Sequence, residues 1–366
     1  MKLDAALRTA LPARRAHSIS FFEFWPDWLF YLPVVLHWMA LGIRYRDFSL
    51  PTAANPTITA GGLCGESKVE ILDQVTGPCR DLVARYTSIV THRWDAHADT
   101  QVAEQAIREA DLHYPLIAKP DIGCNGTGVR LVDGEADLFR YLAAFPRRER
   151  VLLQEFVADD GEAGIFYVRH PGEPVGRITS VTLKHAPVVT GDGRSTLKQL
   201  VLADPRAGRV PQLYLPRLLR RLHEVPRQGE RIRLVFVGNH CKGSIFQDAT
   251  GLVTPLLMRS VERIAAAMPG FHFGRIDVRF TTLPALLRGE GFRIIEINGV
   301  GSEATHVWDP TTRLRDAWRA QFFHYGAAFR IGAANRAHGC RSSGLRALYA
   351  LWQRQKRLMS MYPLND

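Results

Sequence analysis

The stretch HYPLIAKPDIGCNGTGVRLV, residues 113–132, runs an apolar segment into a lysine, a proline and a loop with three glycines. Its residues 116–119 predict a short strand that ends at Lys119. Glycines allow successive backbone N–H groups to converge on phosphate oxygens, and the lysine adds a positive charge beside them. The stretch therefore indicates a phosphate-binding site, with a glycine-rich hairpin as the alternative. It is not a Walker loop, because no Gly-Lys-Ser/Thr follows.

The segments GRIDVRF (274–280) and FRIIEING (292–299) predict two strands with polar residues at alternate positions. If the strands pair, one face carries four polar side chains, namely Arg275, Asp277, Glu296 and Asn298. We expect Ile295 and Ile297 on the opposite side, toward the core. Carboxylates and amides are hard oxygen ligands of the kind that Mg²⁺ takes while it binds nucleotide phosphates. A structural ion pair between the guanidinium and a carboxylate is the alternative.

A third group of polar residues accompanies the predicted strands 151–157 and 178–184. Glu155 lies near the end of the first strand, and Glu162 follows after a turn. Backbone amides together with these carboxylates have the chemistry to read an adenine edge and a ribose diol. Lys184, at the end of the second strand, would add a second phosphate contact.

The remaining patterns complete an alternation of strands and helices. Asp99 and Ser195 are candidate N-caps of two helices. Further helices are expected at 138–145 and 256–268, and a further strand at 231–238. Residues 49–62, rich in Pro, Gly and Thr, are expected to form a connector. Elements mixed in this order predict an α+β fold with antiparallel strand pairs.

The order of these segments resembles the ATP-grasp superfamily of carboxylate–amine ligases over residues 66–325. The matching segments are LIAKPDIGCNGTGV, QEFV, GE at 161–162, VTLKHAPVV, GDGRSTLKQLV, GRIDV and EING. The triad of Asp277, Glu296 and Asn298 and the spacing of Glu155 and Glu162 are similar to those of D-alanine–D-alanine ligases. The segment from KHAPVV through ADPRAG is closer to cyanophycin synthetase and bacterial glutathione-forming ligases. The resemblance implies an ATP-grasp fold, in which two α/β subdomains grip ATP between them.

The resemblance also implies roles for individual residues. The residues expected to bind ATP are Lys119, Gly123, Asn125, Gly126, Thr127, Gly128, Gln154, Glu155, Val157, Glu162 and Lys184. The glycine-rich loop would close over the phosphates, the residues 154–157 would face adenine, and Glu162 would face the ribose. Those expected to bind two Mg²⁺ ions, with Mn²⁺ as an alternative, are Asp277, Glu296 and Asn298. The catalytic residues would be Arg275, over the transferring phosphate, and Lys184.

Two parts of the chain depart from that family. Residues 1–65 are tryptophan-rich and show no α/β domain of the usual kind, although GGLCGES (61–67) is similar to a glycine-rich stretch of D-alanine ligases. After Asn298 the chain reads GVGSEATHVWDP, where those ligases have Thr, a small residue and Pro-Gly. We therefore expect three parts: an apolar N-terminal segment and linker (1–65), an ATP-grasp domain (66–325) and a basic helical tail (326–366).

The ends of the chain and its charge suggest surface contacts. The formal net charge is +11, and no acid occurs between Asp316 and Asp366. Residues 345–358 form a basic amphipathic pattern, which suits a helix on an anionic membrane, with packing on the core as the alternative. The apolar stretch 21–43 contains two acids and two prolines, too many interruptions for one spanning helix. It suits an interfacial helix or a helix packed on the core, with a signal peptide as a further alternative.

The five cysteines include no Cys-x-x-Cys pair, which favours a reducing compartment. We therefore expect a cytoplasmic protein, with peripheral contact to the inner face of the membrane as an alternative. The expected function is an ADP-forming ligase that joins a carboxylate to an amine, with amino acids or peptides as substrates. The alternatives are an ATP-grasp kinase or carboxylating enzyme, and a non-catalytic ATP-binding protein. A nucleic-acid partner would rest on charge alone.

Overall fold

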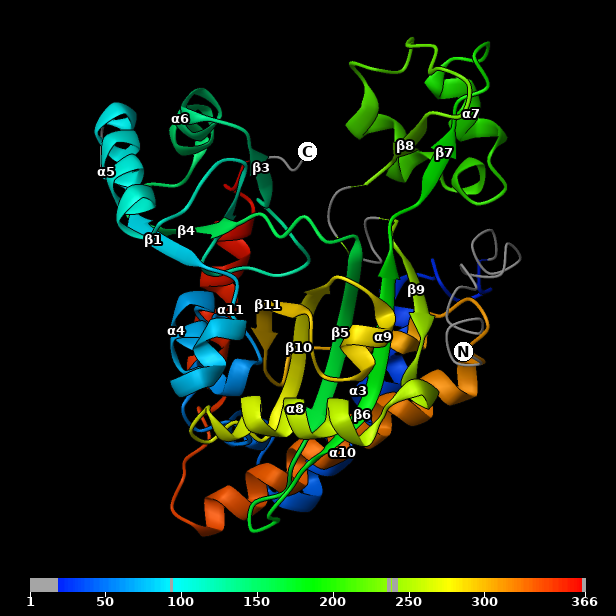
Figure 1. Cartoon of the computed structure of the whole chain (residues 1–366). Helices are drawn as coiled ribbons and strands as arrows, with labels where there is room; N and C mark the ends of the chain where they lie inside the picture. Colours follow the sequence, from blue (N-terminus) through cyan, green and yellow to red (C-terminus); the bar gives the residue numbers. More distant parts are fainter. Residues whose placement is uncertain (1–18, 93–94, 236–237, 239–242, 364–366) are drawn as a thin grey trace.

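The computed structural model describes residues 19–92, 95–235, 238 and 243–363, and its strands form antiparallel sheets (Figure 1). The strands are β1 (Tyr86–Val90), β2 (Leu116–Pro120), β3 (Arg130–Val132), β4 (Arg150–Glu155), β5 (Gly161–Val168), β6 (Arg177–His185), β7 (Val188–Thr190), β8 (Arg231–Arg233), β9 (Ile245–Asp248), β10 (Phe273–Phe280) and β11 (Phe292–Asn298). The helices are α3 (Asp27–Tyr45), α4 (Lys68–Asp73), α5 (Ala96–Glu109), α6 (Glu135–Ala144), α7 (Leu197–Ala203), α8 (Pro255–Ala266), α9 (Leu283–Leu287), α10 (Leu314–Ala337) and α11 (Leu345–Met359). The mixture of helices with antiparallel sheets confirms the predicted α+β class.

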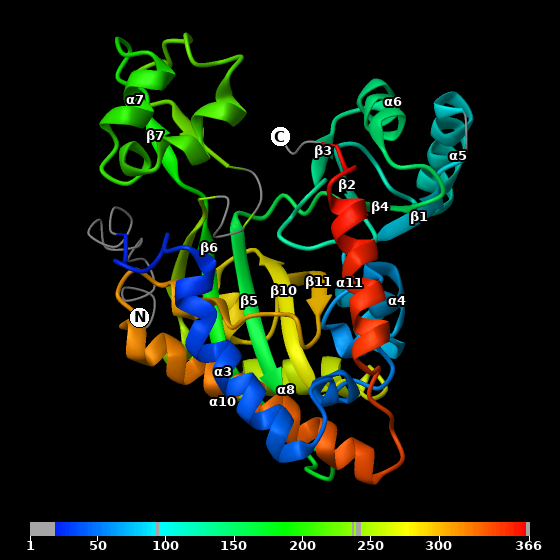
Figure 2. The same ribbon diagram turned by 180° about the vertical axis from the view of Figure 1, so that it is seen from behind.

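The larger sheet has the strand order β11-β10-β5-β6-β9. Alternation along β5 sends Ala163, Ile165 and Tyr167 into a core with the apolar face of α8. On the other face, Phe166 and Val168 pack against Ala327 and neighbouring small residues of α10. Figures 1 and 2 show α8 on one side of this sheet and α10 on the other. The same face that packs on α10 at one end of the strands carries charged side chains at the other end.

The smaller sheet, in the order β1-β4-β2-β3, is covered by α5 and α6. Its core also receives Leu358 and Tyr362 from the end of α11 and the residues after it. Tyr362 donates a hydrogen bond to the backbone oxygen of Ile122 (2.7 Å). The C-terminal segment is therefore part of the fold and runs along the side of both sheets (Figure 2).

A third unit consists of the two-stranded sheet β7-β8, α7 and several short 3-10 helices. Its small core includes Val189, Leu197 and Tyr214. Arg206 of this unit is almost fully buried and forms an ion pair with Glu23 of the N-terminal segment. Arg206 is therefore an internal structural contact and not part of a solvated surface.

The N-terminal helix α3 packs along α10 through aromatic side chains. The ring of Trp38 lies 5.1 Å from Phe329, and the indole nitrogen of Trp318 donates to the backbone oxygen of Phe30 (3.0 Å). The alternative that the apolar N-terminal stretch packs on the core is therefore confirmed for one face of α3. In the part of the chain that the structure describes, no helix has the length and apolarity needed to cross a bilayer.

Residues 49–62, which we expected to form a connector, are largely buried. They form two short 3-10 turns, and Leu50, Ala53 and Asn55 are fully buried. The Asn55 amide donates to the backbone oxygen of Phe273 (2.8 Å) and accepts from the backbone N–H of the same residue (3.0 Å). The proline- and glycine-rich composition here serves close packing beside α10 and β10.

Several predicted boundaries are wrong by a few residues. The cap of α5 is Asp95 and not Asp99, because Asp95 accepts from two backbone N–H groups while Asp99 is buried in the first turn. The cap of α7 is Thr196 and not Ser195, since Thr196 forms a reciprocal capping box with Gln199. Part of the strand predicted at 231–238 lies outside the described residues, and β8 covers its first three positions.

Candidate active site

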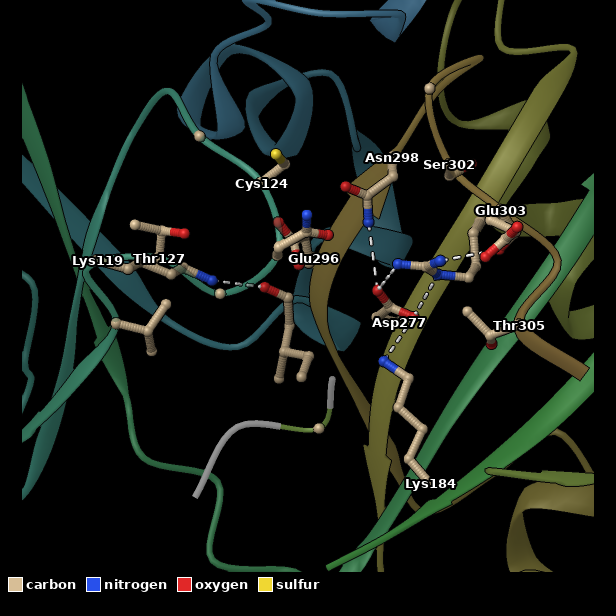
Figure 3. Close-up of a pocket in the computed structure, with 18 of the residues that line it drawn as sticks. Lys119, Cys124, Thr127, Lys184, Asp277, Glu296, Asn298, Ser302, Glu303 and Thr305 are labelled. Atoms are coloured by element: carbon tan, nitrogen blue, oxygen red, sulfur yellow. Dashed lines mark hydrogen bonds and ion pairs between the residues drawn. The ribbon is translucent and has the colours of Figure 1, made fainter. Parts of the chain in front are cut away.

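The two larger sheets face each other across a cleft of about 790 Å³. The cleft is lined by every site residue predicted from the sequence except Gly128. Lys119 comes from the smaller sheet, while Glu162, Lys184, Asp277, Glu296 and Asn298 come from the larger one (Figure 3). The fold thus brings together residues that are up to 179 positions apart (from Lys119 to Asn298).

Lys119 is the penultimate residue of β2, and its side chain connects the two sheets. Its ammonium donates to the side-chain oxygen of Gln154 (2.9 Å) and to the backbone oxygen of Ile295 (3.0 Å). Burial in the protein lowers the pKa of Lys119 to about 8. Near neutral pH the lysine is therefore charged but close to losing its proton, and a bound anion would hold the proton in place.

We expect the affinity for ATP to be constant below about pH 8 and to fall above it, by up to about tenfold per pH unit. The reason is that the phosphates favour the protonated form of Lys119, which the free protein loses as the pH passes its lowered pKa. Lys184 does not share this behaviour, because its pKa is raised. Titration calorimetry from pH 7 to pH 9.5 measures the slope. A Lys119→Met variant should bind weakly at all these pH values, and an equal slope in that variant would assign the titration to another group.

Asp277 is the centre of the charged network on the larger sheet. Its carboxylate accepts from Arg275 Nε (2.9 Å), from Lys184 Nζ (3.0 Å) and from the Asn298 amide (3.2 Å). Burial alone would raise the pKa of Asp277, but Arg275 and Lys184 hold it below its ordinary value. Conversely, burial opposes the charge on Lys184, yet Asp277 and Glu162 raise its pKa. Both groups are therefore ionised at neutral pH.

The pairing of β10 with β11 confirms the shared polar face, with one correction. Asp277 lies opposite Glu296, and Arg275 lies opposite Asn298. The register then shifts, so that Ile294 and not Ile295 takes the core position next to Val278. Ile295 is the extra residue of a β-bulge and lines the cleft. The bulge has a consequence for the site, because the backbone oxygen of Ile295 accepts the hydrogen bond from Lys119.

The residues predicted to bind metal fit a nucleotide-bound Mg²⁺ ion better than an independent metal centre. Among the described residues, no group of three or more His, Cys, Asp or Glu side chains is arranged to hold a metal. Asp277 and Glu296 supply two carboxylates on directly opposed positions, and Asn298 supplies an amide beside them. Mg²⁺ in nucleotide sites takes one or two carboxylates and completes its shell with phosphates and water. This donor set agrees with that chemistry.

The residues predicted to contact the nucleoside are in the cleft, but two of their carboxylates already have protein partners. Glu162 pairs with Lys184 (3.2 Å) and Arg279 (3.3 Å). Glu155, at the end of β4, pairs with Arg85 (2.9 Å). Val157 lies beyond the end of β4, so the predicted strand 151–157 starts one residue late and ends two residues late. The side chain of Glu155 is therefore engaged in an ion pair at the edge of the cleft.

The glycine-rich loop between β2 and β3 lies over the Lys119 side of the cleft (Figure 3). The backbone oxygen of Gly123 accepts from Lys68 Nζ (2.6 Å), and that of Gly128 accepts from the Tyr141 hydroxyl (2.8 Å). Gly128 has a φ of 73°, and a Cβ there would lie 2.7 Å from Pro120. Glycine is therefore required at this position, which anchors the loop outside the cleft itself.

Amide hydrogens of residues 123–128 are expected to exchange faster in the free protein than with a non-hydrolysable ATP analogue bound. A glycine-rich lid orders when its N–H groups find phosphate oxygens. Hydrogen exchange measured by mass spectrometry checks this, with a peptide from β5 as the internal reference. Equal protection of the loop in both states would contradict a role in phosphate binding.

The structure adds functional candidates that sequence reasoning missed. Glu66 lines the cleft, and its buried Oε2 atom has no hydrogen-bond partner among the residues that the structure describes. Burial raises the pKa of Glu66. Lys68 lies 3.6 Å from Glu296, and Glu303 accepts from the Tyr31 hydroxyl (2.9 Å). The segment GGLCGES, which contains Glu66, was the sequence feature that could have indicated this residue. The backbone oxygens of its first two glycines accept hydrogen bonds from the turn after Asn298.

One wall of the cleft is aromatic and comes from the N-terminal segment, from β9 and from the region after β11. Its members are Phe24, Trp25, Phe30, Tyr31, Phe246 and Trp308. Phe30 and Trp308 are 4.7 Å apart between ring centroids. The composition of the N-terminal segment predicts an apolar helix and does not predict a role in the site.

No protein-family model matches the sequence, and no curated protein is significantly similar to it. Among solved structures, a bifunctional glutathione synthetase from Pasteurella multocida is 16% identical over 70% of this chain and 35% of its own, with a TM-score of 0.34. A D-Ala:D-Ser ligase from Enterococcus faecalis is 15% identical over 73% of this chain and 64% of its own, with a TM-score of 0.39. A D-alanine–D-alanine ligase from Bacillus anthracis is 13% identical over 76% of this chain and 69% of its own, with a TM-score of 0.41. This chain thus spans about a third of the first protein and just under two thirds of the second. At these sequence identities and TM-scores the likeness does not establish a function. A function must therefore be argued from the residues of the cleft.

Proposed function

We propose that the protein is an ATP-dependent ligase that joins a carboxylate to an amine. The observation that carries the proposal is the pair of buried lysines, Lys119 and Lys184, that face a cluster of Arg275, Asp277, Glu296 and Asn298 in one cleft. Buried cations beside carboxylates at a sheet edge are suited to ATP phosphates and their Mg²⁺. The resemblance of the sequence motifs to the ATP-grasp superfamily supports the same conclusion.

The proposed reaction has two steps. A carboxylate oxygen of the first substrate attacks the γ-phosphorus of ATP, ADP leaves, and an acyl phosphate forms. The nitrogen of the amine then attacks the acyl carbon, inorganic phosphate leaves, and the nitrogen gives up a proton. When bound, Mg²⁺ would neutralise charge on the phosphates.

The residues of this chain would act by position and charge, since the reaction needs no covalent nucleophile. Lys119 and Lys184 would hold phosphate oxygens from opposite sheets. Arg275, fixed by Asp277 and by the backbone oxygen of Glu303 (2.9 Å), would stabilise charge on the transferring group. The glycine-rich loop 123–128 would exclude water, which protects an acyl phosphate from hydrolysis.

The test is a screen of ADP release across amino acids, dipeptides and hydroxy acids supplied in pairs. A ligase requires both an acid and an amine for rapid ADP formation. ADP formed with one substrate alone would instead indicate a kinase, and ADP that depends on bicarbonate would indicate a carboxylating enzyme. ATP binding without turnover in any pair would favour a non-catalytic nucleotide-binding protein.

A further inference from the structure

Helix α3 has a second apolar face that points away from the protein. Six side chains between 45 and 69% exposed make up this face, which we call the α3 stripe: Trp28, Leu32, Val35, Leu36, Met39 and Ile43. At 100° per residue these positions fall within about 100° of arc. The opposite face, with Phe30 and Val34, is buried. Burial of one face therefore leaves an equally apolar face without cover among the described residues.

The surroundings of the α3 stripe are basic. No Asp, Glu, Lys or Arg occurs between Asp27 and Arg44, and Arg44 and Arg46 are exposed at the end of the helix. On the adjoining α10, the exposed side chains include Arg315, Arg319, Phe323 and Arg330. The acids on these two helices are Asp27, exposed at the start of α3, and Asp316, which pairs with Arg319 (3.1 Å). An apolar stripe bordered by arginines matches the chemistry of an anionic lipid surface.

Helix α11 repeats the pattern on the other side of the cleft. Its inner face packs on the smaller sheet through Leu358, while Leu345, Tyr349 and Trp352 are exposed. Lys356 lies 5.1 Å from the ring of Trp352. Figure 2 shows α3 and α11 on the same face of the molecule, with strands of the larger sheet between them. Tryptophan and tyrosine beside basic residues are the side chains that favour the headgroup region of a membrane.

The cleft opens between these two helices. Phe24, Trp25 and Asp27, which lead into α3, line one side of it, and Gln355 of α11 lines the other. Phe21, next to Trp25 (5.2 Å between ring centroids), is strongly exposed. An aromatic path therefore runs from the exposed end of α3 to the wall of the cleft.

We propose that the face formed by the α3 stripe and α11 docks on an anionic membrane and presents the cleft to an amphiphilic substrate held there. The second half of this statement rests on the proposed ligase function, whereas the first half does not. A second copy of the chain is a poorer occupant of the stripe, because a symmetric dimer would bring the same arginines face to face.

The docking is tested by sedimentation of the full chain with vesicles of phosphatidylcholine, with and without phosphatidylglycerol. We expect binding to the anionic vesicles, weakened by salt, and little binding to the neutral ones. A Leu32→Ser/Leu36→Ser variant should partition at least about tenfold more weakly, since two apolar side chains no longer insert. The matched control is Val175→Ser/Leu219→Ser, which removes two equally exposed apolar side chains outside the α3 stripe.

Two results would overturn the docking. One is failure of the unmodified chain to sediment with anionic vesicles at low salt. The other is equal loss of binding in the stripe variant and the control, which would make the contact non-specific. Light scattering tests the other possible occupant, a second copy of the chain. A dimer that dissociates in the stripe variant, together with no vesicle binding, would assign the α3 stripe to a second copy.

The substrate class is tested by ADP release with paired amines or acids that share a head group but carry a long or a short alkyl chain. We expect the long-chain member, supplied in anionic vesicles, to be used at least about tenfold better, because the docked cleft meets it at the surface. Vesicle binding with preference for the short-chain member would reject the amphiphilic substrate and leave the ligase intact. Vesicle binding without ADP release for any pair would reject the ligase and leave the docking intact.

Discussion

Replacing Asp277 with asparagine is expected to lower the rate of ADP release by on the order of 10³-fold or more. The variant would lose the carboxylate that we propose to bind Mg²⁺ and also the charge that holds Arg275 and Lys184 in place. Glu296→Gln should have a similar effect on turnover with less effect on stability, because its side chain is 29% exposed and its salt bridge to Lys68 is long (3.6 Å). The two variants together separate loss of chemistry from loss of structure.

The matched control is Glu262→Gln on α8, the helix that covers the opposite face of the same sheet. Glu262 accepts from the Tyr167 hydroxyl (2.6 Å) and pairs with Arg169 (3.4 Å), so this variant also breaks a partly buried carboxylate network. It should lower the thermal midpoint while leaving ADP release per folded molecule unchanged. Wild-type turnover of both Asp277→Asn and Glu296→Gln at saturating Mg²⁺ would show that these carboxylates do not serve the nucleotide.

The polar face of the site was predictable because strand alternation is a local property of the sequence. Arg275 with Asp277 and Glu296 with Asn298 follow from side chains two residues apart, and the observed register places them opposite each other. The bulge at Ile295 was not predictable in the same way. The segment RIIEIN alternates equally well in either register, and only the contact with Lys119 from another sheet distinguishes them.

The role of the N-terminal segment was also beyond the sequence pattern. An apolar, aromatic stretch indicates burial but not which surface it covers. In the structure, Phe30 and Tyr31 reach the cleft, Trp38 packs on α10, and the α3 stripe remains exposed. These three environments exist on one helix because α10, the cleft and the solvent surround it, and each of them is formed by residues far away in the chain. The caps of α5 and α7 were missed by four residues and one residue for a simpler reason, since each has a second capping residue nearby.

The buried ion pair between Glu23 and Arg206 fixes that N-terminal segment to the β7-β8 unit. Both side chains are at most 2% exposed. Glu23 also accepts from the backbone N–H of Ser20 (3.2 Å), and it lines the cleft. Because a charge left alone in the interior is costly, the pair couples the aromatic wall of the cleft to a unit that is otherwise separate in the sequence.

Glu23→Leu and Arg206→Met are each expected to lower the free energy of unfolding by about 3–5 kcal/mol, because either change leaves one buried charge without its partner. The double variant should lose much less than the sum, since it removes both charges and replaces them with apolar side chains of similar volume. Urea unfolding measures the stabilities of the unmodified chain, the two single variants and the double variant. Hydrogen exchange of residues 19–31 shows whether this segment is the part that opens.

Glu224→Gln is the control, because its pair with Arg221 in the same unit is exposed and should contribute less than about 1 kcal/mol. Additive losses in the double variant would mean that Glu23 and Arg206 contribute independently, and the N-terminal segment would then be held mainly by the packing of Phe22 and Phe30 on Trp308.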